Sequence, residues 1–258
     1  MLVKSQVKYI QSLGQKKFRD EDGSFIAEGV KIINELLFAS NTSLIRLFAS
    51  EDWIERNSAM IQGLLPDKLI PVTESELERI SFLQTPNQVL GVFRKPVFKT
   101  ADIQKTITLL LDEIQDPGNL GTMIRMADWF NIRKIFCSKD CADAFNPKVI
   151  QSTMGSIARV EVMHADLKTI LDNHPEVPVY AATLDGENIN ETKKISKGFI
   201  MIGNESKGIK PELLKPSVHQ ITIPKLGQAE SLNAAVAAGI VIYAIVSLNK
   251  TLQDNAKP

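Results

Sequence analysis

The sequence predicts a protein of two α/β domains, the second built on a mainly parallel sheet. The chain has 258 residues, a length that is comfortable for two domains. Apolar stretches of strand length alternate with helical patterns along the chain. In the second part the strands are apolar runs with little charge, as expected for a parallel sheet that helices cover on both faces.

The first domain, residues 1–95, reads as a small sheet with helices packed on it. Helical spacing or capping signals predict helices at 5–13, 25–39, 51–64 and 74–80. Short apolar runs predict strands at 44–49, 68–72 and 88–94. The stretch 18–23 is polar and reads as a turn. Thr73 followed by Glu76 forms a capping box that begins the last helix.

A polar, proline-led linker at 96–104 leads to the second domain, residues 105–258. Apolar runs predict strands at 106–112, 134–138, 160–162, 179–184, 199–203 and 220–224. Between and after them, helices are predicted at 122–130, 146–154, 167–173, 211–214 and 231–248. Ligands of parallel sheets usually lie at the carboxyl ends of the strands, so the loops there are where a site is expected.

Charge limits what an RNA-binding surface can look like in this chain. The 30 basic and 30 acidic residues cancel, whereas nucleic-acid proteins often carry a strong positive excess. Any RNA surface must therefore be a local patch. The start of the chain offers one candidate, with five basic residues before the first acidic one: Lys4, Lys8, Lys16, Lys17 and Arg19. The alternative is a solvated helix face.

Several classes of protein are disfavoured. Cys137 and Cys141 have no further cysteine or histidine pair nearby to complete a zinc site, so we expect reduced thiols, a cytoplasmic protein and no metal. The first residues lack the apolar core and cleavage site of a signal peptide. The apolar run at 234–246 is short for a membrane span and is expected to be a buried helix.

Polar residues gather in three loops that follow predicted strands. The first loop, 116–122, is rich in turn residues and precedes Arg125 by one helical turn. The second, 203–208, places two glycines around polar residues, which lets a ligand approach the backbone. The third runs from 223 to 233 and ends in residues that can cap a helix. Each loop taken alone also fits a plain connection between elements.

Together the three loops resemble the motifs of the SpoU (TrmH-like) family of SPOUT-class RNA 2′-O-ribose methyltransferases. The matching segments are NLGTMIRMA at 119–127, GNESKG at 203–208, and IPKLG leading into SLN between 223 and 233. This resemblance covers roughly residues 106–248. The segment FIAEGVKIINELL is similar to the first helix of the L30e-like substrate-binding domain that is often fused to this catalytic domain.

The resemblance implies a SPOUT domain with a C-terminal trefoil knot, a homodimer, and S-adenosyl-L-methionine as cofactor. It assigns the cofactor to four positions: Thr183, Gly203, Ile223 and Leu232. It assigns catalysis to five polar positions: Asn119, Arg125, Glu205, Ser231 and Asn233. Because a guanidinium has a pKa above about 12, we expect Arg125 to bind a phosphate and stabilise the developing alkoxide, whatever its part in proton transfer. Asn119 is expected to orient Arg125 or the ribose, and Glu205 to fix the loop or Arg125.

The expected function is therefore transfer of a methyl group to a ribose 2′-hydroxyl of RNA, with rRNA favoured because L30e-like domains bind kinked or looped RNA. The alternatives are a tRNA methyltransferase and a catalytically silent RNA-binding or ribosome-assembly protein. A Rossmann-type nucleotide enzyme lacks support, since no GxGxxG follows an early strand. The three histidines, His164, His174 and His219, lie outside the motifs. Trp53 and Trp129 are expected to be packing residues.

Overall fold

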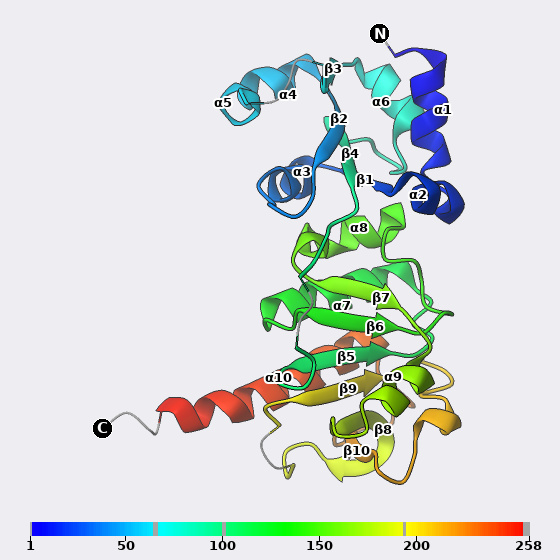
Figure 1. Ribbon diagram of the computed structural model, residues 1–258, viewed down its shortest axis with the longest axis vertical. Coiled ribbons are helices and arrows are strands. Elements are labelled where there is room, and N and C mark those ends of the chain that lie inside the picture. The colour runs from blue at the N-terminus through cyan, green and yellow to red at the C-terminus, as the bar shows by residue number, and fades with distance from the viewer. Residues whose placement is uncertain (1, 64–66, 100–101, 193–194, 255–258) are drawn as a thin grey trace. The chain divides into compact units, whose positions relative to one another are not determined.

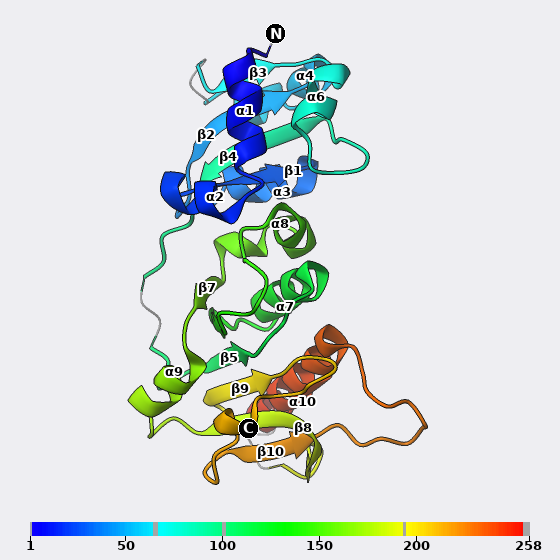
Figure 2. The same ribbon diagram turned by 90° about the vertical axis from the view of Figure 1, so that its right-hand side faces the viewer.

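A computed structural model of the chain describes residues 2–63, 67–99, 102–192 and 195–254, without the side chains of 247–254. It divides into two compact units (Figures 1 and 2). Unit 1 comprises Met1–Phe98 and Asp143–Ala158, and unit 2 comprises Lys99–Ala142 and Arg159–Pro258. Residues 143–158 thus cluster with the first unit, although they lie in the sequence of the predicted second domain. The predicted domain limits stay predictions.

Unit 1 is a four-stranded sheet with helices on both faces. Its strands are β1 (Ser24–Glu28), β2 (Leu44–Ala49), β3 (Leu69–Pro71) and β4 (Val89–Arg94). They lie in the order β1-β4-β2-β3, with β4 antiparallel to both neighbours and β2 parallel to β3. The helices are α1 (Lys4–Ser12), α2 (Lys16–Asp22), α3 (Val30–Leu37), α4 (Glu51–Arg56), α5 (Ser58–Ile61), α6 (Glu74–Ile80) and α8 (Pro147–Thr153), followed by the 3-10 turn η1 (Ser156–Ala158).

Successive side chains along each strand point to opposite faces of this sheet, and each face is covered separately. Ile26, Phe48 and Val92 belong to a core cluster that α1 and α6 close with Ile10 and Leu77. On the opposite face, α3 contacts both β1 and β4, and α8 contacts β1. Apolar burial therefore holds helices from the start of the chain and from residues 147–153 on the same sheet.

Two predictions at the start of unit 1 are wrong. Residues 18–23 lie in α2 and its following glycine rather than in a turn, and the predicted helix 25–39 is β1 followed by α3. Strand β1 pairs with β4 over its whole length and is completely buried, which outweighs its local helical pattern. Gly29 then turns the chain with φ +94°, a conformation that glycine adopts readily. By contrast, β2 and the capped helix α6 are confirmed at their predicted bounds.

Unit 2 is a six-stranded parallel sheet, which confirms the predicted fold class. Its strands are β5 (Ile107–Leu111), β6 (Lys134–Cys137), β7 (Glu161–His164), β8 (Val179–Asn188), β9 (Gly198–Ile202) and β10 (His219–Thr222). They lie in the order β10-β8-β9-β5-β6-β7. The helices are α7 (Pro117–Trp129), α9 (Leu167–Asn173), the 3-10 turn η2 (Pro211–Leu213) and α10 (Ala234–Asp254). The trefoil knot stays a prediction.

Helices cover both faces of this sheet, as the apolar strands require. Helix α9 and η2 pack on one face through a cluster that includes Leu110, Leu171 and Met201. Helices α7 and α10 contact each other on the opposite face (Figures 1 and 2). No helix in the described part of the chain is long and apolar enough to span a membrane.

The ends of two helices differ from prediction. Helix α7 begins at Pro117 rather than near residue 122, because Asp116 caps it and a proline suits the first helical position. Helix α10 begins at Ala234, three residues after the predicted start, and Asn233 accepts hydrogen bonds from Ala235 N and Val236 N. Thus the two helix starts nearest the motif residues are fixed by side-chain caps.

Candidate functional site

The carboxyl ends of β5, β8 and β9 meet at one edge of the parallel sheet, because the three strands are neighbours and run in the same direction. The first motif leaves β5 at this edge and enters α7. The carboxylate of Asp116 accepts a hydrogen bond from Asn119 N at 2.8 Å, which fixes the first turn of that helix. The amide side chain of Asn119 is thereby held at the beginning of α7.

One hydrogen-bond network joins the three motifs. The Nδ2 group of Asn119 donates to the carboxylate of Glu205, which belongs to the loop after β9. The Oδ1 atom of Asn119 accepts from Asn233 Nδ2 at 3.0 Å, at the start of α10. Glu205 therefore contacts Asn119 rather than Arg125. The side-chain oxygen of Asn233 has a structural role, since this Oδ1 atom caps α10.

Asn204, which the sequence did not single out, organises the loop that carries Glu205. Its backbone forms two hydrogen bonds with Gly208, and its Oδ1 accepts from Ser206 N and Lys207 N. Its Nδ2 group donates to the backbone carbonyl of Glu113 at 2.9 Å. Because the loop closes on itself around Asn204, the position of Glu205 is fixed by backbone as well as by side-chain contacts.

A cluster of charges lies beside this loop and was also missed. Glu113 accepts hydrogen bonds or ion pairs from Lys207 and Lys210, and Lys210 also contacts Asp140 and the buried Asp112. These lysines hold the pKa of Glu113 below its ordinary value, Lys210 having the larger effect. Nothing in the sequence distinguished Glu113 or these lysines from ordinary surface charges.

Arg125 lies apart from the network. It is six residues beyond Asn119 on α7, which corresponds to about 9 Å along the helix axis. Its side chain is exposed, and among the described residues no hydrogen bond or ion pair of its guanidinium is found. An exposed guanidinium without a protein partner is free to bind an anion.

The predicted cofactor residues divide into two groups. Ala181 pairs with Met201, so Thr183 and Gly203, each two residues further on, lie at the same level of the sheet edge. The hydroxyl of Thr222 donates to the carbonyl of Leu184, within β8, at 3.0 Å, and Ile223 directly follows β10, the strand that pairs with β8.

Leu232 and Ser231 belong to a different environment. Both lie in the exposed segment before α10, and Leu232 keeps 45% of its surface accessible. Among the described residues, no contact joins either side chain to the Asn119 network. The segment 225–233 is exposed at every residue, so the third motif reaches the network only through Asn233.

One feature of the sheet edge suits a small polar ligand, and a second fixes the loop beside it. The Oγ1 atom of Thr183 is buried and has no hydrogen-bond partner within the described structure. Buried hydroxyls normally have a partner, so a ligand atom would satisfy it. A Cβ atom on Gly203 would lie 2.4 Å from the carbonyl carbon of Gly208, so the backbone here has room for no side chain.

The two cysteines lie next to the segment that follows β5. Cys141 Sγ donates to the carbonyl of Leu111 and accepts from Ile114 N, each at 3.2 Å. Cys137 is completely buried, and the hydrogen bond with Cys141, together with burial, raises the pKa of its thiol. Both thiols are free, and the contacts of Cys141 hold the chain between β5 and α7.

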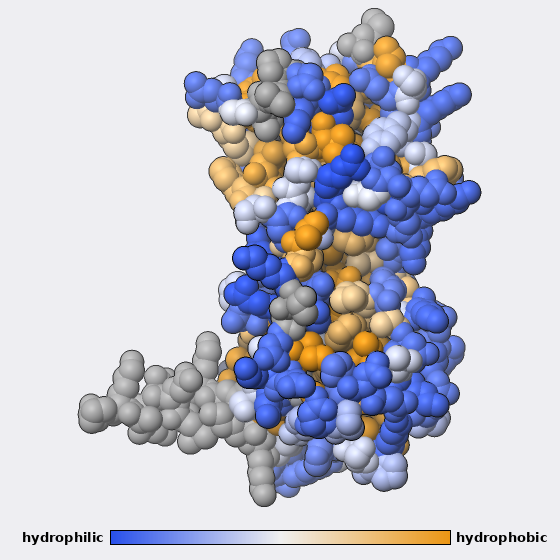
Figure 3. Space-filling model, in the orientation of Figure 1, coloured by the Kyte–Doolittle hydropathy of each residue, from blue (hydrophilic) through white to orange (hydrophobic). Residues whose placement is uncertain are grey.

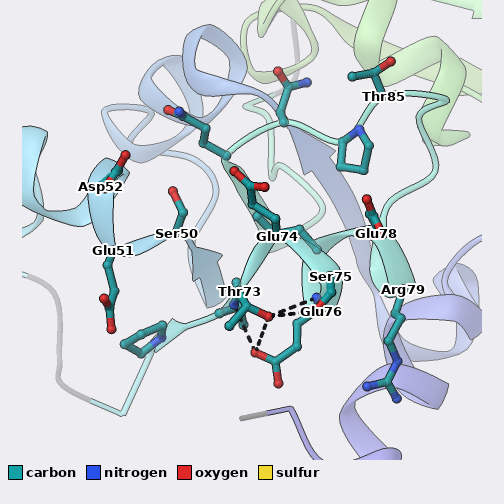
Figure 4. A pocket seen from close by; sticks show the side chains of 16 residues that line it. Ser50, Glu51, Asp52, Thr73, Glu74, Ser75, Glu76, Glu78, Arg79 and Thr85 are labelled. Carbon is teal, nitrogen blue, oxygen red and sulfur yellow. Dashed lines mark hydrogen bonds between the residues drawn. The ribbon is translucent and has the colours of Figure 1, made fainter.

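A separate cleft of about 980 Å³ lies in unit 1 between α4, α6 and the loop 85–88 (Figure 4). The charged residues of its lining are mostly acidic, namely Glu51, Asp52, Glu74, Glu76 and Glu78, with Arg79 as the single basic residue. It holds none of the predicted site residues. Five carboxylates against one guanidinium disfavour the binding of phosphate groups in this cleft.

The candidate basic patch needs one correction. Lys4, Lys8, Lys16 and Lys17 are exposed on α1 and α2, where Figure 3 shows mostly hydrophilic residues. Arg19, however, is 1% exposed and pairs with Asp143. Helix α2 turns the guanidinium inward, where it also donates to the carbonyl of Leu13 at 2.7 Å.

The expectation for the tryptophans holds for one of them. Trp53 is buried in unit 1 with 1% of its surface exposed. Trp129 is 84% exposed at the end of α7, so it lies outside the core of the described residues, and the prediction that it is a packing residue is wrong for the single chain. The sequence could not distinguish the two, because both lie in helices beside apolar residues.

Comparison with known proteins identifies both parts of the chain. The family model described as the SpoU rRNA Methylase family matches residues 106–243, and that of the MRM3-like substrate binding domain matches residues 4–91. The 23S rRNA (guanosine(2553)-2′-O)-methyltransferase RlmP of Bacillus subtilis is 32% identical over 241 residues. That alignment covers 92% of this chain and 94% of the relative.

Solved structures agree over nearly the whole chain. A protein described as an RNA methyltransferase of the TrmH family from Porphyromonas gingivalis is 32% identical, with a TM-score of 0.80 and coverage of 95% of this chain and 98% of that one. The AdoMet-bound rRNA methyltransferase from Sinorhizobium meliloti is 29% identical, with a TM-score of 0.81 and 95% coverage of both chains. With the match over 106–243, these findings establish that the chain belongs to the SpoU rRNA methylase family and is an RNA methyltransferase.

Proposed function

We propose that this protein transfers a methyl group from S-adenosyl-L-methionine to a ribose 2′-hydroxyl of rRNA. The observation that carries the proposal is the network between Asn119, Glu205 and Asn233, which unites three segments distant in sequence. The relatives from B. subtilis and S. meliloti are named as rRNA methyltransferases, which favours rRNA over tRNA. The 2′-hydroxyl is favoured because the B. subtilis relative is named as a 2′-O-methyltransferase.

The residues at the sheet edge fit the cofactor. S-adenosyl-L-methionine supplies a methyl group that its sulfonium already activates. The unpartnered Oγ1 of Thr183 offers a hydrogen bond, and the absence of a side chain at Gly203 lets the backbone of Gly208 pack closely against it, which shapes the loop at this edge. We assign cofactor binding to these two residues and Ile223, with Leu232 covering them from the exposed segment before α10.

Arg125 and Asn119 are assigned two different roles in the reaction, charge stabilisation and substrate positioning. The 2′-hydroxyl is weakly acidic, so the negative charge that develops on its oxygen needs stabilisation. Arg125 supplies a fixed positive charge for that oxygen or for a neighbouring phosphate. Asn119 is already held by Glu205 and Asn233, and this preorganisation fixes the position of a bound ribose before reaction. Ser231 lies in the exposed segment and is assigned to RNA contact.

The lysines of α1 and α2 are the proposed RNA surface of unit 1. Lys4 and Lys8 lie one turn apart on α1, and Lys16 and Lys17 begin α2. Only Lys17 has a described ion pair, a long one of 3.9 Å to Glu21. The carboxylates that line the cleft between α4 and α6 disfavour phosphate groups there, so attraction by charge favours the lysine side.

We also propose that the protein is a homodimer through α7 and α10. Val236, Ile240 and Tyr243 are exposed at one-turn spacing on α10, whereas Ala238 and Ile242 are buried on its other side. Trp129 is exposed on the adjacent α7. A helix that is apolar all round requires a second burial partner, and a second copy of this chain provides one. Sedimentation of the Tyr243→Glu variant as a monomer would support this assignment.

The function is tested by transfer of labelled methyl from S-adenosyl-L-methionine into separated, unmodified rRNA and tRNA. Arg125→Ala is the catalytic variant. Arg133→Ala is its matched control, an exposed arginine whose described contact is with Asn131. We expect label in rRNA ribose, lost with Arg125→Ala and kept with Arg133→Ala.

Each other outcome has a defined meaning. Label in tRNA alone would keep the reaction and overturn the substrate. Label on a base would overturn the ribose assignment. No label in either RNA, with no binding of S-adenosyl-L-methionine, would favour the non-enzymatic RNA-binding role. Full turnover by Arg125→Lys would show that the planar geometry of the guanidinium is not required.

A further inference from the structure

Glu113 has an unusual backbone conformation at the end of β5. Its φ is +53°, in the left-handed region that residues other than glycine and asparagine rarely adopt. Such conformations persist only where surrounding contacts hold them, and they gather at functional sites. The contacts of Glu113 are therefore expected to hold a functional segment in place.

Every polar group of Glu113 is engaged. Its backbone N donates to Ser138 Oγ at 2.9 Å, and its carbonyl accepts from Asn204 Nδ2 at 2.9 Å. Its two carboxylate oxygens accept from different lysines, Oε2 from Lys207 at 3.1 Å and Oε1 from Lys210 at 3.0 Å. The side chain is 13% exposed, so these charged hydrogen bonds are partly shielded from water.

Three of these four contacts go to the loop that carries Glu205. Asn204 precedes Glu205, and Lys207 and Lys210 lie on either side of Gly208. The loop is thus attached to Glu113 both before and after the residue that binds Asn119. Lys207 is 72% exposed, and its ion pair with Glu113 is the only one described for it. Loss of the carboxylate would free this lysine completely.

We infer that Glu113 is a positioning residue of the methyl-transfer site, which clamps the 204–210 loop so that Glu205 meets Asn119. The role of Glu113 in methyl transfer rests on the proposed function, whereas its contacts with the 204–210 loop do not depend on that function. Glu113 acts through the loop and touches neither RNA nor cofactor in this assignment. Its left-handed backbone directs the carbonyl to Asn204 while the carboxylate reaches the two lysines.

Two substitutions separate the roles of the carboxylate and the backbone. Glu113→Gln keeps the shape of the side chain and removes its charge. Glu113→Gly removes the side chain, retains the carbonyl that Asn204 uses, and suits the positive φ. Glu212→Gln is the matched control, because Glu212 is exposed in η2 close to the same loop and has no described ion pair. If Glu113→Gln folds poorly, Glu113→Gly still tests the carboxylate.

Kinetics distinguish positioning from general stability. We expect both Glu113 variants to lose roughly 10-fold or more in kcat, because a small displacement of a catalytic group has a large effect on rate. The KM for RNA should stay unchanged, and Glu212→Gln should resemble the original protein. A purely structural role would lower the amount of active enzyme and the melting temperature without this split. If both Glu113 variants keep kcat within 2-fold of the original, on the order of experimental variation, the inference is overturned.

A second measurement needs no activity. Release of the loop should speed tryptic cleavage after Lys207 in the native protein by about 5-fold, since local opening controls such cuts. If the original protein transfers no methyl group, the proposed function fails, while the cleavage rates still decide whether Glu113 clamps the loop. Equal cleavage rates in the original protein and both variants would overturn the clamp even if methyl transfer were established.

Discussion

Replacing Asp143 by asparagine removes the carboxylate that neutralises a buried arginine in unit 1. The side chain of Arg19 is 2% exposed and that of Asp143 is 14% exposed. Arg19 donates to Asp143 Oδ2 from Nη2 and, at 3.2 Å, from Nε, and to the carbonyl of Leu13 from Nη1. In the Asp143→Asn variant, the guanidinium keeps oxygen acceptors but loses the opposite charge.

The structure sets the size of the effect. Removal of one partner from a buried ion pair costs about 3–5 kcal/mol of unfolding free energy, because the remaining charge stays buried. The amide oxygen of the variant and the Leu13 carbonyl continue to accept hydrogen bonds, so we expect about 3 kcal/mol. With a urea dependence of about 2 kcal/mol/M, the unfolding midpoint should fall by about 1.5 M.

Trp53 provides the assay. It is one of two tryptophans in the chain and is buried in unit 1, whereas Trp129 in unit 2 is largely exposed. In a Trp129→Phe background, fluorescence of Trp53 follows the unfolding of unit 1 alone. Urea titrations of the Asp143→Asn variant and of its parent then measure the difference directly.

Asp20→Asn is the matched control for this experiment. The carboxylate of Asp20 is 50% exposed and pairs with Lys95, so its loss should cost only about 0–1 kcal/mol. A midpoint shift for Asp143→Asn no larger than that for Asp20→Asn would refute the reasoning. It would mean that water or a rearranged side chain compensates the buried guanidinium.

Three further predictions concern the site and a helix cap. Gly203→Ala should lower affinity for S-adenosyl-L-methionine roughly 10-fold in calorimetric titration, because the new Cβ would force the Gly208 backbone away. The control Gly63→Ala places its Cβ in open space and should leave this affinity unchanged. Asn233→Ser should keep the cap of α10 and the melting temperature, but slow methyl transfer roughly 10-fold through loss of the hydrogen bond to Asn119. The pKa of Glu76 is lowered by hydrogen bonds from Thr73 N and Leu2 N. The ionised carboxylate therefore adds stability that is complete above its unfolded pKa of about 4.3. This stability is lost as the pH falls through the lower pKa of the folded state. The stability difference between Glu76→Gln and the original protein should therefore vanish in urea titrations at low pH.

Local signals were sufficient where a segment's structure depends on its own residues. The capping box of Thr73 and Glu76 predicted the start of α6, and the apolar run ending at Leu111 predicted β5. The grouping of Asn119, Glu205 and Asn233 was also predictable, since parallel strands bring their following loops to one edge.

Long-range contacts decided the segments that were predicted wrongly. Strand β1 has a helical apolar pattern, but its partner β4 begins more than sixty residues later in the chain. Helix α2 has little apolar periodicity, and the contact of Arg19 with Asp143 bridges 124 positions. Neither partner can be identified from the segment itself, because contacts of such separation leave no local pattern.

The contribution of Glu113 was hidden for a different reason. A left-handed backbone is usually announced by glycine or asparagine, and a glutamate gives no such signal. Asn204 was equally silent, since its role is to bond the backbone of its own loop and the carbonyl of Glu113. Residue type therefore predicts which side chains react or bind better than it predicts which residues hold those side chains in position.

The inclusion of residues 143–158 in unit 1 governs how this chain can be divided or recombined. A fragment ending near residue 98 would lack Phe145, whose ring contacts Phe25, and would leave the buried arginine without its counter-charge. The complementary fragment would expose Val149 and Ile150, which are buried in the whole chain. Chimaeras that exchange substrate-binding units between relatives therefore require junctions near 98, 142 and 158, and a graft with one crossover should be insoluble.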